Sequence, residues 1–125
     1  MDEKQRVMVK WLENEVKGKK WTDYILSYGY KNISVYGAGD LGKYLIWEFR
    51  NSDIHINSVI DRRAEDIVTF EGYPVYTIEA FLEAGMETDA IIVTTVTGYD
   101  DVLKTVAEKR IELPVMSLRD MVFEL

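Results

Sequence analysis

The hydrophobic positions of the chain follow two spacings, one typical of strands and one typical of helices. Apolar runs at Ile33–Tyr36, His55–Asp61 and Ala90–Thr95 predict strands, the last of them buried on both faces. A helix is predicted between the first two runs, with its apolar positions at Leu41, Tyr44, Leu45 and Phe49. We expect these two strands to be parallel, because right-handed crossovers join parallel strands.

The rest of the chain from residue 62 extends this pattern. Polar residues 62–70 predict a loop, and Glu71–Tyr76 predicts a turn and a short edge strand, since Pro74 cannot donate a ladder hydrogen bond. The other predicted elements are a short helix opened by Tyr76 or Thr77 and running through Ala84, a helix over Asp100–Arg110, a strand at Pro114–Met116 and a terminal helix capped by Ser117. We therefore expect an α/β fold of three layers around a mostly parallel sheet of about five strands.

The first 30 residues carry two sets of apolar positions at helical spacing. The first set is Val7, Met8, Trp11, Leu12 and Val16, and the second is Trp21, Tyr24, Ile25 and Tyr28. Gly18 separates the sets and Gly29 ends the second. We expect residues 1–30 to form a helical extension and residues 31–125 to form the main domain. The extension packs either on the sheet or on a second copy of the chain, as a homodimer.

The first predicted strand runs into a glycine-rich loop, Gly37-Ala38-Gly39-Asp40-Leu41-Gly42, which has the pattern G-x-G-x-x-G. Gly37 permits a tight turn, Gly39 lets a pyrophosphate approach the backbone, and Gly42 lets the helix pack closely on the sheet. The N–H groups and dipole at the start of a helix favour an anion. The loop therefore predicts nucleotide binding, and we expect Asp40 within it to stabilise the first helical turn.

Asp61 follows Gly42 by 19 residues, about the spacing at which a carboxylate reaches the hydroxyls of a ribose. Arg62 and Arg63 come next, and arginines at this place accept a 2′-phosphate or stack on adenine. The acid favours NAD(H) over NADP as the ligand. CoA is an alternative, because it would place its pyrophosphate on the same loop.

Thr94 and Thr95 leave the carboxyl end of the predicted central strand, where ligands of open α/β sheets bind. Their hydroxyls could bond a ribose or a phosphate, although threonine is also a common strand residue. The predicted cofactor-binding residues are thus Gly37, Ala38, Gly39, Asp40, Leu41, Gly42, Asp61, Arg62, Arg63, Thr94 and Thr95.

Length and composition exclude several other classes of protein. A chain of 125 residues is expected to form one domain, and its net charge of −7 argues against nucleic acid, whose binders carry a basic face. Because the sequence has no cysteine, thiolate chemistry is excluded. No apolar run approaches the roughly 20 residues of a membrane span, so we expect no membrane partner and a cytoplasmic location. We also expect no metal site and no catalytic residues, since no carboxylate pair, nucleophile–base pair or histidine cluster stands at useful spacing.

The segment from Val35 to Leu118 resembles the Rossmann-type NAD- or CoA-binding domains of bacterial sugar-nucleotide dehydratases and surface-polysaccharide proteins. It equally resembles the NAD(H)-sensing domain of Rex-type redox repressors. The shared features are the G-A-G-x-x-G loop, the acid Asp61 and the turn Gly72-Tyr73-Pro74-Val75-Tyr76. The resemblance implies a Rossmann-like fold and a bound nucleotide.

The chain also departs from both families. Rex-type repressors carry a winged-helix domain before the glycine loop, where this chain has about 30 residues. The dehydratases use a Tyr-x-x-x-Lys pair, whereas Tyr99 and Lys104 are five residues apart.

The resulting hypothesis is a stand-alone nucleotide-binding module for NAD(H), acting as a sensor or accessory subunit in sugar-nucleotide or surface-polysaccharide metabolism. One alternative is a small NAD-dependent sugar-nucleotide oxidoreductase, isomerase or dehydratase completed by oligomerisation. Another is an interaction domain with an empty cleft.

Overall fold

The computed structural model describes residues 1–95, 98–109 and 112–125. Val96 and Thr97, which adjoin the predicted threonine site, and Arg110, the end of a predicted helix, lie outside the described residues. The helices are α1 (Glu3–Val16), α2 (Trp21–Ser27), α3 (Asp40–Phe49), α4 (Ile78–Glu83), α5 (Tyr99–Glu108) and α6 (Leu118–Glu124). The strands are β1 (Asn32–Tyr36), β2 (His55–Ile60), β3 (Thr69–Phe70), β4 (Tyr73–Tyr76), β5 (Ala90–Val93) and β6 (Val115–Ser117).

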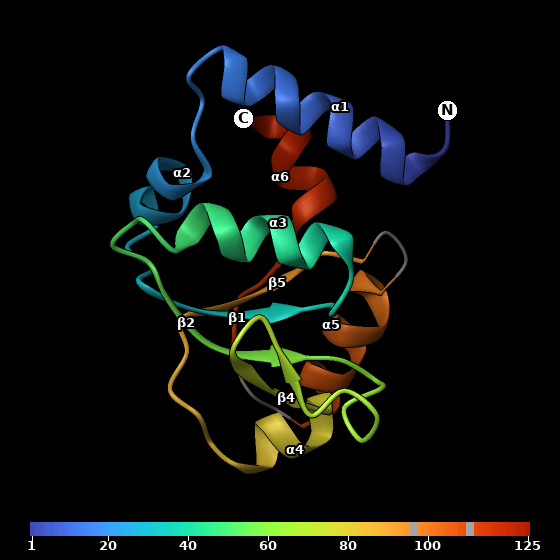
Figure 1. Cartoon of the computed structure of the whole chain (residues 1–125). Coiled ribbons are helices and arrows are strands. Elements are labelled where there is room, and N and C mark those ends of the chain that lie inside the picture. Colours follow the sequence, from blue (N-terminus) through green and yellow to red (C-terminus); the bar gives the residue numbers. More distant parts are fainter. Residues whose placement is uncertain (96–97, 110–111) are drawn as a thin grey trace.

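The protein has an α/β fold built on a mostly parallel sheet (Figure 1). The strands lie in the order β3-β4-β2-β1-β5-β6. Every neighbouring pair is parallel except β3 and β4, which are antiparallel. The expectation of about five strands is therefore wrong, because the described residues form six.

The additional strand, β3, lies inside the segment that the sequence predicts to be a loop. It makes β4 an internal strand, which corrects the expectation that Tyr73–Tyr76 lies at the sheet edge. Two residues, Glu71 and Gly72, join β3 to β4, and their φ angles are 52° and 86°. Two positive φ angles in a two-residue loop are typical of the type I′ turn, whose twist matches that of paired strands.

The hairpin between β3 and β4 is fastened to the carboxyl end of α3 through Glu71. Its carboxylate accepts hydrogen bonds from Nε1 of Trp47 at 2.9 Å and from Arg50 at 3.2 Å. Arg50 also donates to the Glu71 carbonyl at 2.8 Å. These contacts hold a non-glycine residue in the sparsely populated left-handed region.

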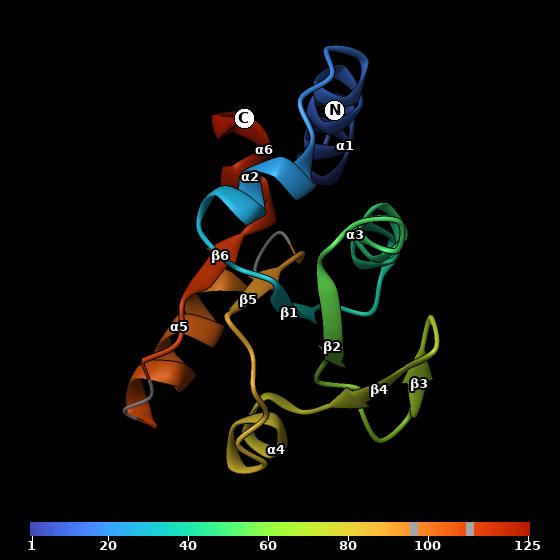
Figure 2. The same ribbon diagram turned by 90° about the vertical axis from the view of Figure 1, so that its left-hand side faces the viewer.

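Helices cover both faces of the sheet, which gives the three layers that the sequence predicts (Figure 2). On one face residues of α2, α3 and α6 share a buried cluster with Ile33, Val35 and Ile92, and α1 lies outside this layer against α6 (Figure 1). On the other face α4 and α5 pack over Ile91 and Val93. Alternate residues of β5 therefore enter opposite cores, as expected for a central strand buried on both sides.

The N-terminal helices pack on the rest of the same chain. Val7 and Trp11 of α1 are buried with the residues of α3 and α6, and the side-chain amide of Asn14 donates to the Val122 carbonyl at 2.9 Å. Val9 and Leu12 of α1 remain exposed. α1 thus packs on α3 and α6 of the same chain and not directly on the strands, and contact with a second copy stays a prediction. No helix of the described residues is both long enough and apolar enough to cross a bilayer.

Candidate functional site

The glycine loop connects β1 to α3 at the carboxyl edge of the sheet. The N–H of Gly37 donates to the Ile60 carbonyl at 2.8 Å, and its φ is 119°. A Cβ atom at Gly37 would overlap the hydroxyl of Thr94, and one at Gly42 would overlap the Gly37 carbonyl. Packing alone therefore requires both glycines, as expected for the tight turn and for the close approach of the helix.

Gly39 differs from these two glycines. It is the N-cap of α3 and has an extended backbone with φ −127°. A Cβ atom built on Gly39 meets nothing within 4 Å. Gly39 is exposed, whereas Ala38 and Leu41 are buried. The fold does not require a glycine here, so the open space beside Gly39 is available to a ligand.

Asp40 lies in the first turn of α3, as predicted, and forms an ion pair with Lys4 of α1 at 2.8 Å. The hydrogen bond and the charge of Lys4 lower the pKa of the Asp40 carboxyl. Both side chains are about half exposed, with relative areas of 47% and 55%. Sequence reasoning missed Lys4, because no local pattern shows that α1 reaches this loop.

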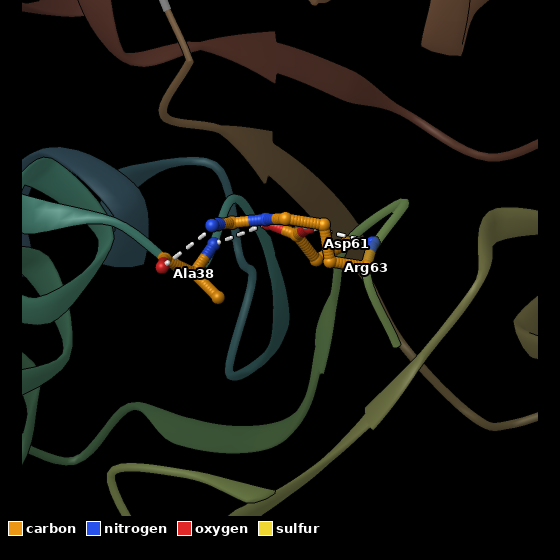
Figure 3. Close-up of polar contacts among 3 residues, drawn as sticks. All are labelled: Ala38, Asp61 and Arg63. Carbon is orange, nitrogen blue, oxygen red and sulfur yellow. Dashed lines mark hydrogen bonds and ion pairs between the residues drawn. The ribbon is translucent and has the colours of Figure 1, made fainter. Parts of the chain in front are cut away.

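Asp61 directly follows β2 and is the most connected polar group of the site (Figure 3). One carboxylate oxygen, Oδ2, accepts from the N–H of Ala38 at 2.8 Å. The other, Oδ1, accepts from the backbone N–H of Arg63 at 2.9 Å and from its Nε at 3.1 Å. The guanidinium of Arg63 also reaches the Ala38 carbonyl at 3.3 Å. Asp61 therefore joins the end of β2 to the glycine loop.

The Asp61 side chain is only 10% exposed, and its carboxyl is nevertheless held ionised. Burial by itself would raise the pKa of Asp61, but hydrogen bonds from Arg63 and from the Ala38 N–H lower it below its ordinary value. A buried carboxylate at this place is thus ready to accept donors from a ligand if its present donors move.

The neighbouring arginine, Arg62, points to a different partner. Its guanidinium pairs with Asp101 of α5 at 3.0 Å, and both side chains are well exposed. Such an exposed pair contributes little to stability. Arg62 and Arg63 thus extend from adjacent positions toward two different sides of the site.

The two predicted threonines after β5 have different environments. Thr94 is buried, and its hydroxyl donates to the Tyr36 carbonyl at 2.8 Å. Thr95 is exposed. The hydroxyl hydrogen of Thr94 is therefore used within the fold, and Thr95 is the threonine presented to the surface hollow described next.

Two neighbouring hollows share Tyr36 and Arg62. The first has a volume of about 280 Å³ and is also lined by Asp61, Arg63, Thr95 and Gly98. The second, of about 430 Å³, lies between α4 and α5 and includes Thr77 and Asp101 in its wall. Their linings contain charged side chains of both signs, among them Asp61, Arg62, Arg63 and Asp101.

The structure thus brings Asp61, Arg62, Arg63 and Thr95 around one hollow, and a hydrogen bond joins Asp61 to the glycine loop. Sequence reasoning missed Tyr36 and Gly98 as lining residues. Gly98 immediately precedes α5, where a Cβ atom would overlap the Thr95 hydroxyl and come within 3.3 Å of the Tyr36 ring. The sequence offered one signal for Gly98, namely a glycine that stands between the predicted central strand and the next predicted helix.

Two further observations concern chemistry at the site. Tyr99 stands five residues before Lys104, one residue more than in a Tyr-x-x-x-Lys pair. Its hydroxyl donates to the Val115 carbonyl at 3.2 Å. Within the described parts of the chain, no three His, Asp or Glu side chains gather where they could hold a metal ion.

When the chain is compared with models of known protein families and with curated proteins, none matches.

Proposed function

We propose that the protein is a nucleotide-binding module that holds a pyrophosphate-containing ligand, NAD(H) in the first place, at the carboxyl edge of its sheet. The observation that carries the proposal is the contrast among the loop glycines. Packing requires Gly37 and Gly42, whereas Gly39 has open space beside it and a backbone that any residue could adopt. A glycine that the fold does not need, at the start of a helix, favours a ligand that approaches the backbone.

The topology supports the same site. Taken in chain order, the parallel strands lie 3-2-1-4-5, which is the order of the doubly wound Rossmann-like folds. In such sheets the ligand crevice opens where the strand order reverses, here between β1 and β5. The glycine loop follows β1, and Thr95 follows β5.

The residues present fit a dinucleotide. No side chain of the described residues caps the amino end of α3, so its first N–H groups would face the pyrophosphate. Asp61 would face the ribose, and the hollow lined by Tyr36 and Gly98 would take part of the remainder of the nucleoside. When bound, NAD(H) would supply redox sensing or hydride chemistry. NADP and CoA share the pyrophosphate and are the competing ligands.

We further propose that the module acts as a sensor or accessory subunit in sugar-nucleotide or surface-polysaccharide metabolism. This part of the proposal rests on the sequence resemblance of the loop, of Asp61 and of the turn before α4.

The test is calorimetric titration of the wild-type protein and of Gly39→Ala and Gly39→Val with NAD⁺, NADH, NADP⁺ and CoA. Gly39→Ala is expected to unfold near the wild-type temperature, because its added Cβ atom meets nothing within 4 Å, and the unfolding temperature of Gly39→Val is measured beside it. The affinity for the ligand should fall stepwise, by at least about tenfold in Gly39→Val, which is a loss of about 1.4 kcal/mol. Equal affinity in all three proteins, or no binding by the wild type, would refute the proposal.

A further inference from the structure

The four acceptor positions of the Asp61 carboxylate are all used within the chain. A carboxylate has about four lone-pair sites. Backbone N–H groups of Ala38 and Arg63 take two of them, at 2.8 and 2.9 Å. The guanidinium of Arg63 takes the other two, with Nε at 3.1 Å from Oδ1 and Nη2 at 3.4 Å from Oδ2.

These two pairs of donors differ in mobility. The backbone donors are fixed by the glycine loop and by the turn after β2. The Arg63 side chain lies along the Asp61 carboxylate (Figure 3), and it is 59% exposed whereas the Asp61 side chain is 10% exposed. Only the side chain can leave without unfolding the loop.

A ribose diol and a guanidinium fork present the same kind of surface to a carboxylate, namely two adjacent donors in one plane. We propose that Arg63 occupies the ribose-binding positions of Asp61 in the free protein and competes there with the ribose of the ligand. This inference rests on the proposed nucleotide-binding function. A ribose with two free hydroxyls must displace the guanidinium from Asp61.

The displaced guanidinium stays beside the ribose, because its backbone N–H is still bonded to Asp61. A phosphate on that ribose would pair with it, since guanidinium and phosphate form strong two-point contacts. A ribose with a 2′-phosphate has one hydroxyl fewer for Asp61 and brings a negative charge close to that carboxylate, and the guanidinium that it gains offsets part of this cost. Arg63 thus lowers the affinity for the unphosphorylated ribose and reduces the preference for NAD(H) that Asp61 creates.

The experiment compares NAD⁺ and NADP⁺ binding by the wild type, Arg63→Ala, Arg63→Lys and Arg62→Ala, using calorimetry. Arg63→Ala should bind NAD⁺ about three- to tenfold more tightly than the wild type and NADP⁺ more weakly. Arg62→Ala is the matched control: it removes the same charge one residue away, but its partner is Asp101. It should change both affinities by a similar factor. Arg63→Lys keeps the charge without the fork and should retain NADP⁺ binding.

A second measurement uses the wild type alone. The Nε–H resonance of Arg63 in a proton–nitrogen NMR spectrum should shift when NAD⁺ is added, as its bond to Asp61 breaks. If the wild type binds NAD⁺ while that resonance stays unchanged, or if Arg63→Ala binds NAD⁺ no more tightly, the role of Arg63 is refuted and nucleotide binding stands. If neither nucleotide binds to any of the proteins, both proposals fall.

Discussion

The carboxylate of Asp61 accepts a hydrogen bond of 2.8 Å from the backbone N–H of Ala38, which fixes the end of β2 against the loop after β1. Asp61 follows Ala38 by 23 residues in sequence, yet in space its carboxylate supports the loop. A residue predicted to bind a ligand therefore also contributes to the free energy of unfolding.

Replacing Asp61 with Asn should lower the free energy of unfolding by about 1–3 kcal/mol at neutral pH, because a charged acceptor is lost beneath Arg63 and Ala38. Urea unfolding of wild type and variant measures the difference.

The pH dependence follows from the lowered pKa of Asp61 in the folded chain. Its stabilisation is fully present above the unfolded pKa of about 3.9 and is lost as the pH falls through the lower folded value. The difference between wild type and Asp61→Asn should thus be constant from about pH 5 to 8 and shrink below about pH 4. A difference that grows toward acid would contradict this assignment.

The three loop glycines should separate into two groups by stability. Gly37→Ala and Gly42→Ala should each cost about 1–3 kcal/mol or more, because their methyl groups overlap Thr94 and the Gly37 carbonyl. Gly39→Ala should cost less, about 1 kcal/mol at most, which is the difference between glycine and alanine at an N-cap. Thermal and urea unfolding of the three variants provide the test, and a Gly39→Ala variant destabilised as much as the other two would show that the open space beside it is used by the fold.

Thr94 provides a prediction about a buried hydroxyl. Thr94→Val keeps the shape of the side chain but removes the donor to the Tyr36 carbonyl, so we expect a loss of about 1 kcal/mol. Thr94→Ser retains the hydroxyl and serves as the control in the same urea titrations. A wild-type midpoint in Thr94→Val would mean that this hydrogen bond contributes nothing.

The hydrogen bond between Trp47 and Glu71 should appear as a coupling energy. Trp47→Phe and Glu71→Ala each remove one partner of a contact at 2.9 Å, and the double variant should lose less than the sum of the two. We expect a coupling of about 0.5–1 kcal/mol, obtained from the unfolding free energies of the four proteins. Additive losses would indicate that Arg50 alone fastens the hairpin.

The parts of the fold with a clear spacing were predictable. The order β1–α3–β2, the central strand β5 and the caps Thr77 and Ser117 agree with the structure. The strand β3 was not predictable from spacing, because two residues are too few to show a period. Its only signal was the Glu71-Gly72 pair, and glutamate is uncommon at positive φ.

The candidate site was predictable to a similar extent. The loop and Asp61 were named from their spacing, and the structure joins them through Ala38. The fork that Arg63 forms on Asp61 depends on a side-chain conformation, and the ion pair of Lys4 with Asp40 depends on how α1 packs. The sequence places Arg63 near Asp61 but does not show which rotamer the arginine adopts, and the Lys4–Asp40 pair arises only when two separate segments meet.

The short strand β3 also determines what the sheet presents to other molecules. An edge strand offers unpaired backbone groups on which a foreign strand can grow into an aggregate, and natural proteins blunt this hazard with very short edges. Here β3 covers the side of β4 toward which the N–H of Val75 points, and it ends after two residues at a turn with positive φ. The hairpin thus leaves a neighbouring chain little unpaired backbone at this edge with which to extend the sheet.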